Sequence, residues 1–274
     1  MRLLVDNPIF MRDLNLRFRE MRFMVTLTLT LLLLLLILLV SWPNRNTSLY
    51  FIAKAGKELF GALAFTMMTL LMIVTASFSA TSLSSEKEAK TIETLFISIT
   101  SDWEIVLGKL HAANFHAFLI LVASFPVVLS LFALGGIGAG DVFGCFLYIQ
   151  LVCYTFSAMA TFWSAVFLRS SRNAIGMTVF ASIIWLGLPL LIPVFLHILF
   201  PYSSYREMEE LAKYVLITNP YFVMASFFTS SDRIFDAFLI PPWLMGTLVF
   251  AALSLLFLVL AKEVIYRKRS NYRP

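Results

Sequence analysis

Six long stretches of the sequence contain no Asp, Glu, Lys or Arg, and this pattern limits the fold more than any other feature. They cover residues 23–44, 59–85, 110–140, 142–168, 173–205 and 237–261. Even the shortest has 22 residues, and a helix needs about 20 apolar residues to cross the roughly 30 Å hydrocarbon core of a bilayer. The pattern predicts an all-α polytopic membrane protein with a single six-span transmembrane domain over residues 23–274. We expect its spans at about 23–42, 59–82, 112–137, 143–168, 174–200 and 243–261.

The first span contains ten leucines and could be mistaken for a cleaved signal peptide. Signal peptides have an apolar region of roughly 7–15 residues, followed by a cleavage site of small residues. The run over 23–42 is longer, follows a lead of 22 residues and ends without such a site. We therefore expect a permanent span.

The net charge of +5 reflects topology. With the N-terminus in the cytoplasm, 15 of the 21 Lys and Arg residues fall in the predicted cytoplasmic segments and 6 in the outer ones. Cytoplasmic segments of membrane proteins carry such an excess of positive charge. The sequence therefore predicts that both termini are cytoplasmic, and the basic residues need no nucleic-acid partner.

Residues 1–22 are expected to form an amphipathic helix in the membrane interface. Pro8 suits the first position of a helix. An apolar stripe bordered by arginines is typical of helices that lie along a membrane and contact lipid. A solvated extension of the first span is the alternative. The stripe and its borders include Phe10, Arg12, Leu14, Arg17, Phe18 and Arg19.

The segment SSEKEAKTIETLFISITSDWEIVLGKL (84–110) is the most polar stretch between two spans. Ser85 with Glu88 and Ser101 with Glu104 have the spacing of capping boxes, which start helices. Between them, apolar residues recur at helical spacing, with charged residues on the other side. The pattern predicts a short amphipathic helix on the cytoplasmic surface, with its charged face turned to water or to a partner. The apolar positions are Ala89, Ile92, Leu95, Phe96 and Ile99, and the charged ones are Glu86, Lys87, Lys90 and Glu93.

The outer segment 201–242 contains an uncharged run, 214–231, that Asn219 and Pro220 interrupt. A seventh span there would move the basic C-terminal residues outside, against the charge rule. We therefore expect short re-entrant or surface helices before the sixth span. Inside other spans, Pro126, Pro189 and Pro193 are expected kink sites.

The sequence lacks the residue patterns that several other functions would require. The spans carry no deep ionisable side chain of the kind that ion-driven carriers use; His116 and His197 lie near span ends and are expected to be structural. Cys145 and Cys153 lie eight residues apart on one predicted helix, too far for a disulfide. No metal-ligand spacing and no phosphate-binding loop is present. A nucleotide that drives this protein must therefore bind to another chain.

Residues 84–109 resemble the signature of the type-2 permeases of ATP-binding-cassette (ABC) transporters. Lys90 replaces the usual glycine, and Ile99–Thr100 stands where a proline is common. More loosely, residues 7–20 resemble the family's entrance helix, and Asn219–Pro220 and Pro242–Trp243 resemble its segments near the last span. The matching residues are Ser85, Glu86, Lys87, Glu88, Thr91, Glu93, Leu95, Ser101, Glu104, Ile105, Val106, Leu107, Gly108 and Lys109.

This resemblance implies a transport function. The segment after span two would be the coupling helix, on which a separate ABC ATPase subunit docks through Glu86, Lys87, Glu88, Lys90, Glu93 and Phe96. ATP and Mg would bind to that partner, and this chain itself would hold no cofactor. A second permease copy or a related permease would complete the path, accessory subunits are possible, and Asn219, Pro220 and Phe222 would gate the outer end. Export across a bacterial plasma or inner membrane is expected.

Two other functions remain open at this point. A non-transporting scaffold related to these permeases would keep the ATPase but move no cargo. A membrane-embedded enzyme acting on lipids would need acid, base or nucleophilic groups gathered near one interface. The acidic residues of 84–110 have no histidine or metal-ligand pattern beside them, so the enzyme has less support.

Overall fold

The computed structural model describes residues 7–42, 49–97, 100–199, 214–228, 238 and 240–270. Every regular element in these ranges is a helix. They are α1 (Pro8–Arg19), α2 (Met21–Val40), α3 (Leu49–Ala80), α4 (Ser84–Glu88), α5 (Ile92–Ile97), α6 (Asp102–Ser130), the 3₁₀ helix η1 (Leu131–Ala133), α7 (Ala139–Val166), α8 (Ser171–Leu199), α10 (Pro220–Ala225) and α12 (Pro242–Ser270).

Six of these helices are long and apolar enough to cross a membrane: α2, α3, α6, α7, α8 and α12. The prediction of six spanning helices is thus confirmed for the described residues. α3 and α6 each begin ten residues before the predicted span, and α12 continues nine residues past residue 261. These extensions carry charged residues, which end an apolar run but do not end a helix.

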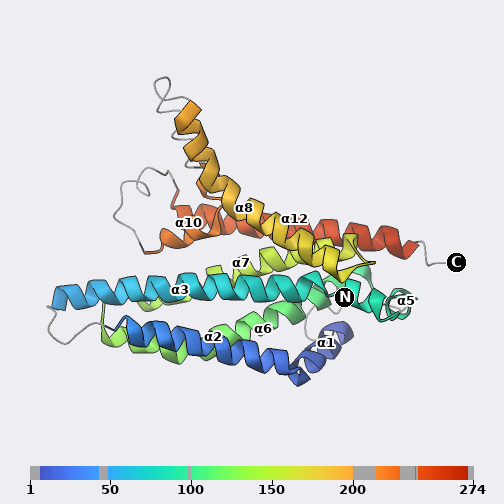
Figure 1. The fold of residues 1–274 in the computed structure, drawn as a ribbon, viewed down its shortest axis with the longest axis horizontal. Helices are drawn as coiled ribbons and strands as arrows, with labels where there is room; N and C mark the ends of the chain where they lie inside the picture. The colour runs from blue at the N-terminus through green and yellow to red at the C-terminus, as the bar shows by residue number, and fades with distance from the viewer. Residues whose placement is uncertain are drawn as a thin grey trace.

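α7 lies at the centre of the bundle and packs along α3 on one side and α12 on the other. Figure 1 shows α2 and α6 beyond α3, and α8 bending away from the other helices toward its C-terminal end. Pro189 and Pro193 lie inside α8, and Pro126 inside α6. A proline removes a backbone hydrogen bond and crowds the preceding turn, so the two prolines give a physical reason for a bend within α8.

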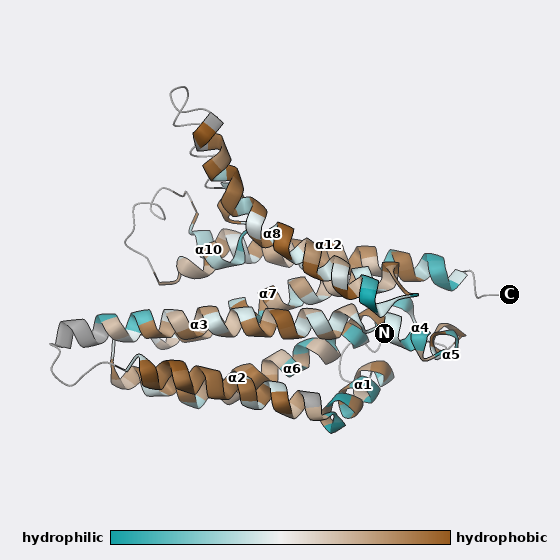
Figure 2. Cartoon of the chain, viewed as in Figure 1, coloured by the Kyte–Doolittle hydropathy of each residue, from teal (hydrophilic) through white to brown (hydrophobic). Residues whose placement is uncertain are grey.

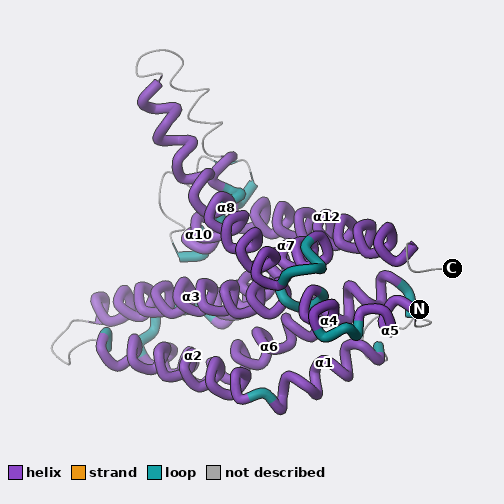
Figure 3. The backbone as a smooth tube through the Cα atoms, turned by 45° about the vertical axis from the view of Figure 1, so that its right-hand side comes forward, coloured by secondary structure: helices purple, strands orange, loops and turns teal. Residues whose placement is uncertain are grey.

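Polar residues gather at one end of the bundle, which we call the polar end (Figure 2). It carries α1, α4, α5 and the last turns of α12, and Figure 3 shows the same four segments together from a second angle. The first and last described helices therefore reach the same side of the bundle. This agrees with an even number of spans, while the assignment of that side to the cytoplasm stays a prediction.

The predicted amphipathic helix after Ser85 is in fact two short helices. α4 ends at Glu88, and Lys90 follows with a φ of 60°, in the left-handed region that favours glycine. Thr91 donates its backbone N–H to Glu86 O over 2.9 Å, which closes the turn. Since helices do not continue through a left-handed residue, α5 starts anew at Ile92. A glycine, as in the resembling family, would adopt this conformation without strain.

The first of the two predicted capping boxes is wrong and the second is confirmed. α4 starts after Leu83 without a side-chain cap, so Ser85 and Glu88 do not form the box. At α6, Glu104 N donates to Ser101 Oγ over 3.3 Å and Ser101 N donates to Glu104 Oε2 over 2.8 Å. Ile99, expected on the apolar stripe, lies outside the described residues.

Candidate functional site

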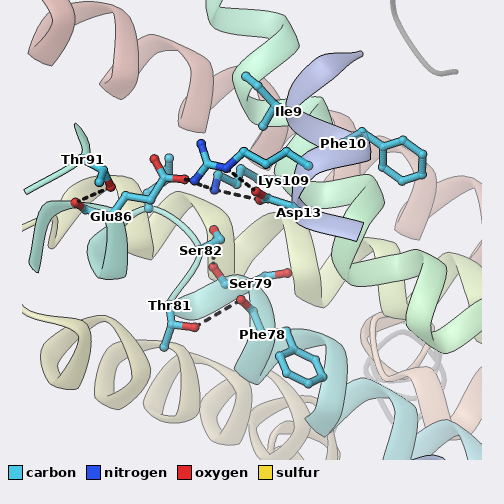
Figure 4. A network of polar contacts seen from close by, with 12 residues as sticks. Ile9, Phe10, Asp13, Phe78, Ser79, Thr81, Ser82, Glu86, Thr91 and Lys109 are labelled. Atoms are coloured by element: carbon cyan, nitrogen blue, oxygen red, sulfur yellow. Dashed lines mark hydrogen bonds and ion pairs between the residues drawn. The ribbon is translucent and has the colours of Figure 1, made fainter. Parts of the chain in front are cut away.

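Three buried charged side chains join α1, α4 and α6 at the polar end (Figure 4). Lys109 of α6 contacts Asp13 of α1, with 2.8 Å between Nζ and Oδ2, and also pairs with Glu86 of α4. All three are less than a tenth exposed. Arg12 adds a contact of 3.3 Å from Nη2 to Glu86 Oε1. We call Asp13, Glu86 and Lys109 the buried ion cluster; the exposed Arg12 borders it.

The ion cluster corrects the expected position of Glu86 on its helix. The sequence places Glu86 on the charged outer face of its helix, whereas the structure turns it inward to Lys109. A buried carboxylate requires a charge partner, and the long side chain of Lys109 supplies it by reaching from α6 to α4. Phe96 is also buried, at 2% exposure, with Ile92 and Leu95 on the inner side of α5.

α1 is a separate helix that is held against α6. Asn7 caps it by accepting from Ile9 N over 3.0 Å, and its amide Nδ2 donates to Glu104 O over 2.8 Å. A side chain at Gly108 would meet Asn7 and Ile9 at 3.1 Å, so the glycine permits this close approach. Because Glu20 is extended between α1 and α2, α1 is not a continuous extension of the first span.

The other candidate residues of α1 divide between an inner and an outer side. Arg17, expected at the edge of the apolar stripe, turns inward with its guanidinium carbon 4.9 Å from the centroid of the Phe78 ring. Burial lowers the pKa of Arg17, while the charges of Asp13 and Glu20 act to raise it. Phe10 and Leu14 are half-buried, whereas Arg12, Phe18 and Arg19 are exposed. Contact of this helix with a membrane stays a prediction.

α4 is also tied to α7 and α8. Ser164 Oγ accepts the backbone N–H groups of Leu83 and Ser84 over 3.1 and 3.2 Å. Glu88 Oε1 accepts the N–H of Ser171, the first residue of α8, over 2.8 Å. Sequence patterns gave no sign of these contacts, because each joins residues some 80 positions apart.

The C-terminal turn of α12 holds α5 and the start of α6. Arg269, 6% exposed, donates from Nε to Phe96 O over 2.8 Å and from Nη1 to Thr100 O over 2.7 Å. Its Nη1 also lies 2.8 Å from Asp102 Oδ1. The sequence marked Arg269 only as one of several basic C-terminal residues, and its contact with the 84–101 segment went unpredicted.

One surface of the 84–101 segment remains open to the surroundings. Lys87 and Glu93 lie 3.7 Å apart across the two helices, and Lys90 is exposed at the turn between them. Ile97, at the end of α5, is 74% exposed. We call this surface the open face; its members are Ser85, Lys87, Glu88, Ala89, Lys90, Thr91, Glu93, Thr94 and Ile97.

Asn219 and Pro220, the expected outer gate, start α10 inside the bundle. Asn219 is fully buried, accepts from Tyr221 N over 2.9 Å and donates to Leu186 O of α8 over 2.9 Å. Tyr148 of α7 donates to Pro220 O over 3.2 Å. Phe222 is half-buried on the same helix. α10 is thus a short helix packed inside the bundle, and its position relative to the membrane stays a prediction; the remainder of the predicted outer helices, in 201–213 and 229–237, lies outside the described residues.

A groove of about 260 Å³ runs between α3 and the first half of α8. Its wall is mainly apolar, and Tyr221 of α10 lines it at the end away from the polar end. Tyr221 Oη lies 2.9 Å from Thr69 Oγ1 of α3. The other side chains in the wall that bear a hydroxyl are Ser77, Thr178 and Ser182. Within the described ranges, no three His, Cys, Asp or Glu side chains gather into a possible metal site.

Comparison with known proteins agrees with this architecture. A search of curated proteins finds no match to the chain. Among models of protein families, that of the ABC-2 family transporter protein matches residues 8–270, which is nearly the full length of the sequence. The match extends from the first residue of α1 to the last residue of α12. The chain therefore belongs to the ABC-2 family of transporter proteins and is a multi-pass membrane permease of this class.

Proposed function

We propose that this chain is the membrane subunit of an ABC exporter and that an ABC ATPase docks on the open face. Membership of the family supports association with an ATPase and with a second permease in general. The observation that carries the specific proposal is the two-sided build of α4 and α5. Their inner side is fixed to the spans through the ion cluster and Arg269, while charged and apolar side chains remain exposed on the other.

The open face changes which residues are expected to contact the ATPase. Lys87, Glu88, Lys90 and Glu93 remain candidates, because their side chains are at least partly exposed. Glu86 and Phe96 act from within, by fixing the segment to the permease. Ile97 joins the docking candidates, because a large exposed apolar side chain beside charged ones is typical of protein interfaces.

The groove between α3 and α8 is the proposed site for cargo on its way across the membrane. Its apolar wall with a few hydroxyl groups suits an amphipathic or lipid-like molecule. Tyr221 and Thr69 close the groove at one end, and α10 would serve as the outer gate. ATP and Mg would be bound by the ATPase, outside this chain, in a bacterial plasma or inner membrane.

Docking is tested with the double variant Glu93→Lys, Ile97→Asp in cells that co-express the ABC ATPase subunits of the same genome. The double variant is expected to insert into the membrane at wild-type level but to lose the co-purifying ATPase. Reversal of Glu86 would be a poor test, since it would break the buried ion cluster as well. The matched control Lys54→Glu, Lys57→Glu changes two side chains at the other end of α3. Undiminished co-purification with the Glu93, Ile97 variant would refute docking on the open face.

A further inference from the structure

The 84–101 segment is attached to the spans in two separate halves. α4 is tied to α8 by the bond between Glu88 Oε1 and Ser171 N, and its first turn is tied to Ser164 of α7. α5 and the residues after it are tied to α12 by Arg269. Between the halves lies the left-handed turn at Lys90, where the helix is interrupted. The two halves therefore connect the same surface to different spanning helices.

Arg269 holds α5 and the residues that follow it through several hydrogen bonds from a charged donor. Its side chain serves three acceptors: Phe96 O at the end of α5, Thr100 O in the linker and Asp102 Oδ1 at the start of α6. Hydrogen bonds from a charged donor are about twice as strong as neutral ones. Since the guanidinium is buried, a shift of α5 without α12 would leave a charge unpaired in an apolar environment, which is costly.

The same turn of α12 also holds the end of α7. Lys268 Nζ donates to Ala165 O over 2.7 Å and to Val166 O over 2.6 Å, at the last turn of α7. α12 also packs along α7 for much of its length. A displacement that reaches Arg269 is therefore passed first to α12, whereas one that reaches Glu88 is passed first to the groove-lining helix α8; α7 contacts both halves.

We propose that Arg269 is a positioning residue that passes the movement of α5 to α12, while Glu88 passes the movement of α4 to α8. This inference rests on the proposed docking of an ATPase on the open face. An ATP-driven movement of the open face would thus be transmitted along two routes that separate at Lys90. One route would act on α8 and the groove between α3 and α8, and the other on α12.

The test places one fluorescent reporter on each helix. Cysteines at Ile175 of α8 or Val259 of α12, both exposed, are labelled with an environment-sensitive dye in the permease–ATPase complex in nanodiscs. The native Cys145 and Cys153 are buried, so background labelling is low. The signal is the fluorescence change on addition of ATP and vanadate. Arg269→Gln is compared with Arg267→Gln, which removes the same charge from an exposed side chain of the same turn.

In the wild type and in Arg267→Gln, both reporters are expected to respond. Arg269→Gln should keep the bound ATPase and the response at residue 175 but lose the response at residue 259. Ser171→Pro removes the N–H that Glu88 accepts and leaves the open face intact, and it should do the reverse. If Arg269→Gln does not fold, Arg269→Lys replaces it and should give a smaller response at 259, because a lysine cannot serve all three acceptors. An unchanged response at 259 in both Arg269 variants, or none at 259 in the wild type, would overturn the inference while docking stands. Failure of any ATPase to bind the wild type would overturn the proposed function itself.

Discussion

At the scale of single residues, Lys109 has the largest expected effect on stability. It is the shared partner of two buried carboxylates, Asp13 and Glu86. Lys109→Met would leave both of them without their main cation, and breaking a buried ion pair by removing one partner costs about 3–5 kcal/mol. We expect a marked fall in the thermal midpoint of the detergent-solubilised protein, followed by circular dichroism.

The control for Lys109 is Lys87→Met, which removes the same side chain from the open face. Lys87 pairs with Glu93 at 3.7 Å, and the Glu93 side chain is 61% exposed. Exposed pairs contribute about 1 kcal/mol or less, so this variant should unfold close to the wild-type midpoint. Equal midpoints for the two variants would contradict a stabilising role of the ion cluster.

The same residues show where sequence reasoning succeeds and where it stops. The capping box of Ser101 and Glu104 was predictable from a pattern within one helical turn, but the same spacing misled at Ser85 and Glu88, because α4 already begins at Ser84. The inward direction of Glu86 was not predictable, because it depends on Asp13 and Lys109, which only the packing of α1 and α6 brings near. The glycine missing at Lys90 was visible in the sequence, but its consequence, a break between two helices, required the backbone conformation.

At the scale of elements, the spanning helices were predictable because an apolar run alone decides whether a segment enters a bilayer. The position of α10 was harder to predict from the sequence. Asn219 and Pro220 predicted an interruption of the uncharged run, but the bond from Asn219 to Leu186 O depends on how α10 packs against α8. Similarly, Arg269 was expected only to orient the chain by its charge, and its bonds to Phe96 and Thr100 depend on the length of α12 beyond the membrane.

The contact between α10 and α12 gives a prediction at this scale. A side chain at Gly246 of α12 would lie 2.5 Å from the Cγ atoms of Val223 on α10. Gly246→Ala should therefore displace α10 from its packed position on α12. Such overpacking should destabilise the protein by about 1–3 kcal/mol. The loss of stability is measured as a fall in the thermal midpoint of unfolding in detergent.

Gly187→Ala is the matched change for Gly246, because nothing lies within 4 Å of the added carbon on α8. Replacing a mid-helix glycine by alanine stabilises by about 0.5–1 kcal/mol when there is room. The two variants should thus shift the midpoint in opposite directions. A rise with Gly246→Ala would show that α10 does not pack on α12 as described.

At the scale of the whole molecule, the spanning helices differ sharply in how much of their surface the chain itself covers. In the most apolar window of each helix, 61% of the residues of α3 and of α7 are buried, against 6% for α8. α8 also lines the groove beside α3. If the groove were open to the bilayer along α8, lipid would enter the cargo path. The proposed function therefore requires a protein surface that covers α8. We expect a second permease copy to provide that surface.

Disulfide cross-linking between two copies tests this arrangement. Ile183, on the exposed side of α8, is 64% exposed, and Val122 of α6 is 54% exposed. If two copies meet along α8, Ile183→Cys should form covalent dimers in membranes treated with a mild oxidant, because a disulfide needs Cα atoms within about 7 Å. Val122→Cys, as accessible but on another helix, should stay monomeric, and the buried native cysteines contribute no background. Equal dimer yields from both positions would point to random collision, and no dimer from Ile183→Cys would mean that α8 faces lipid or a different subunit.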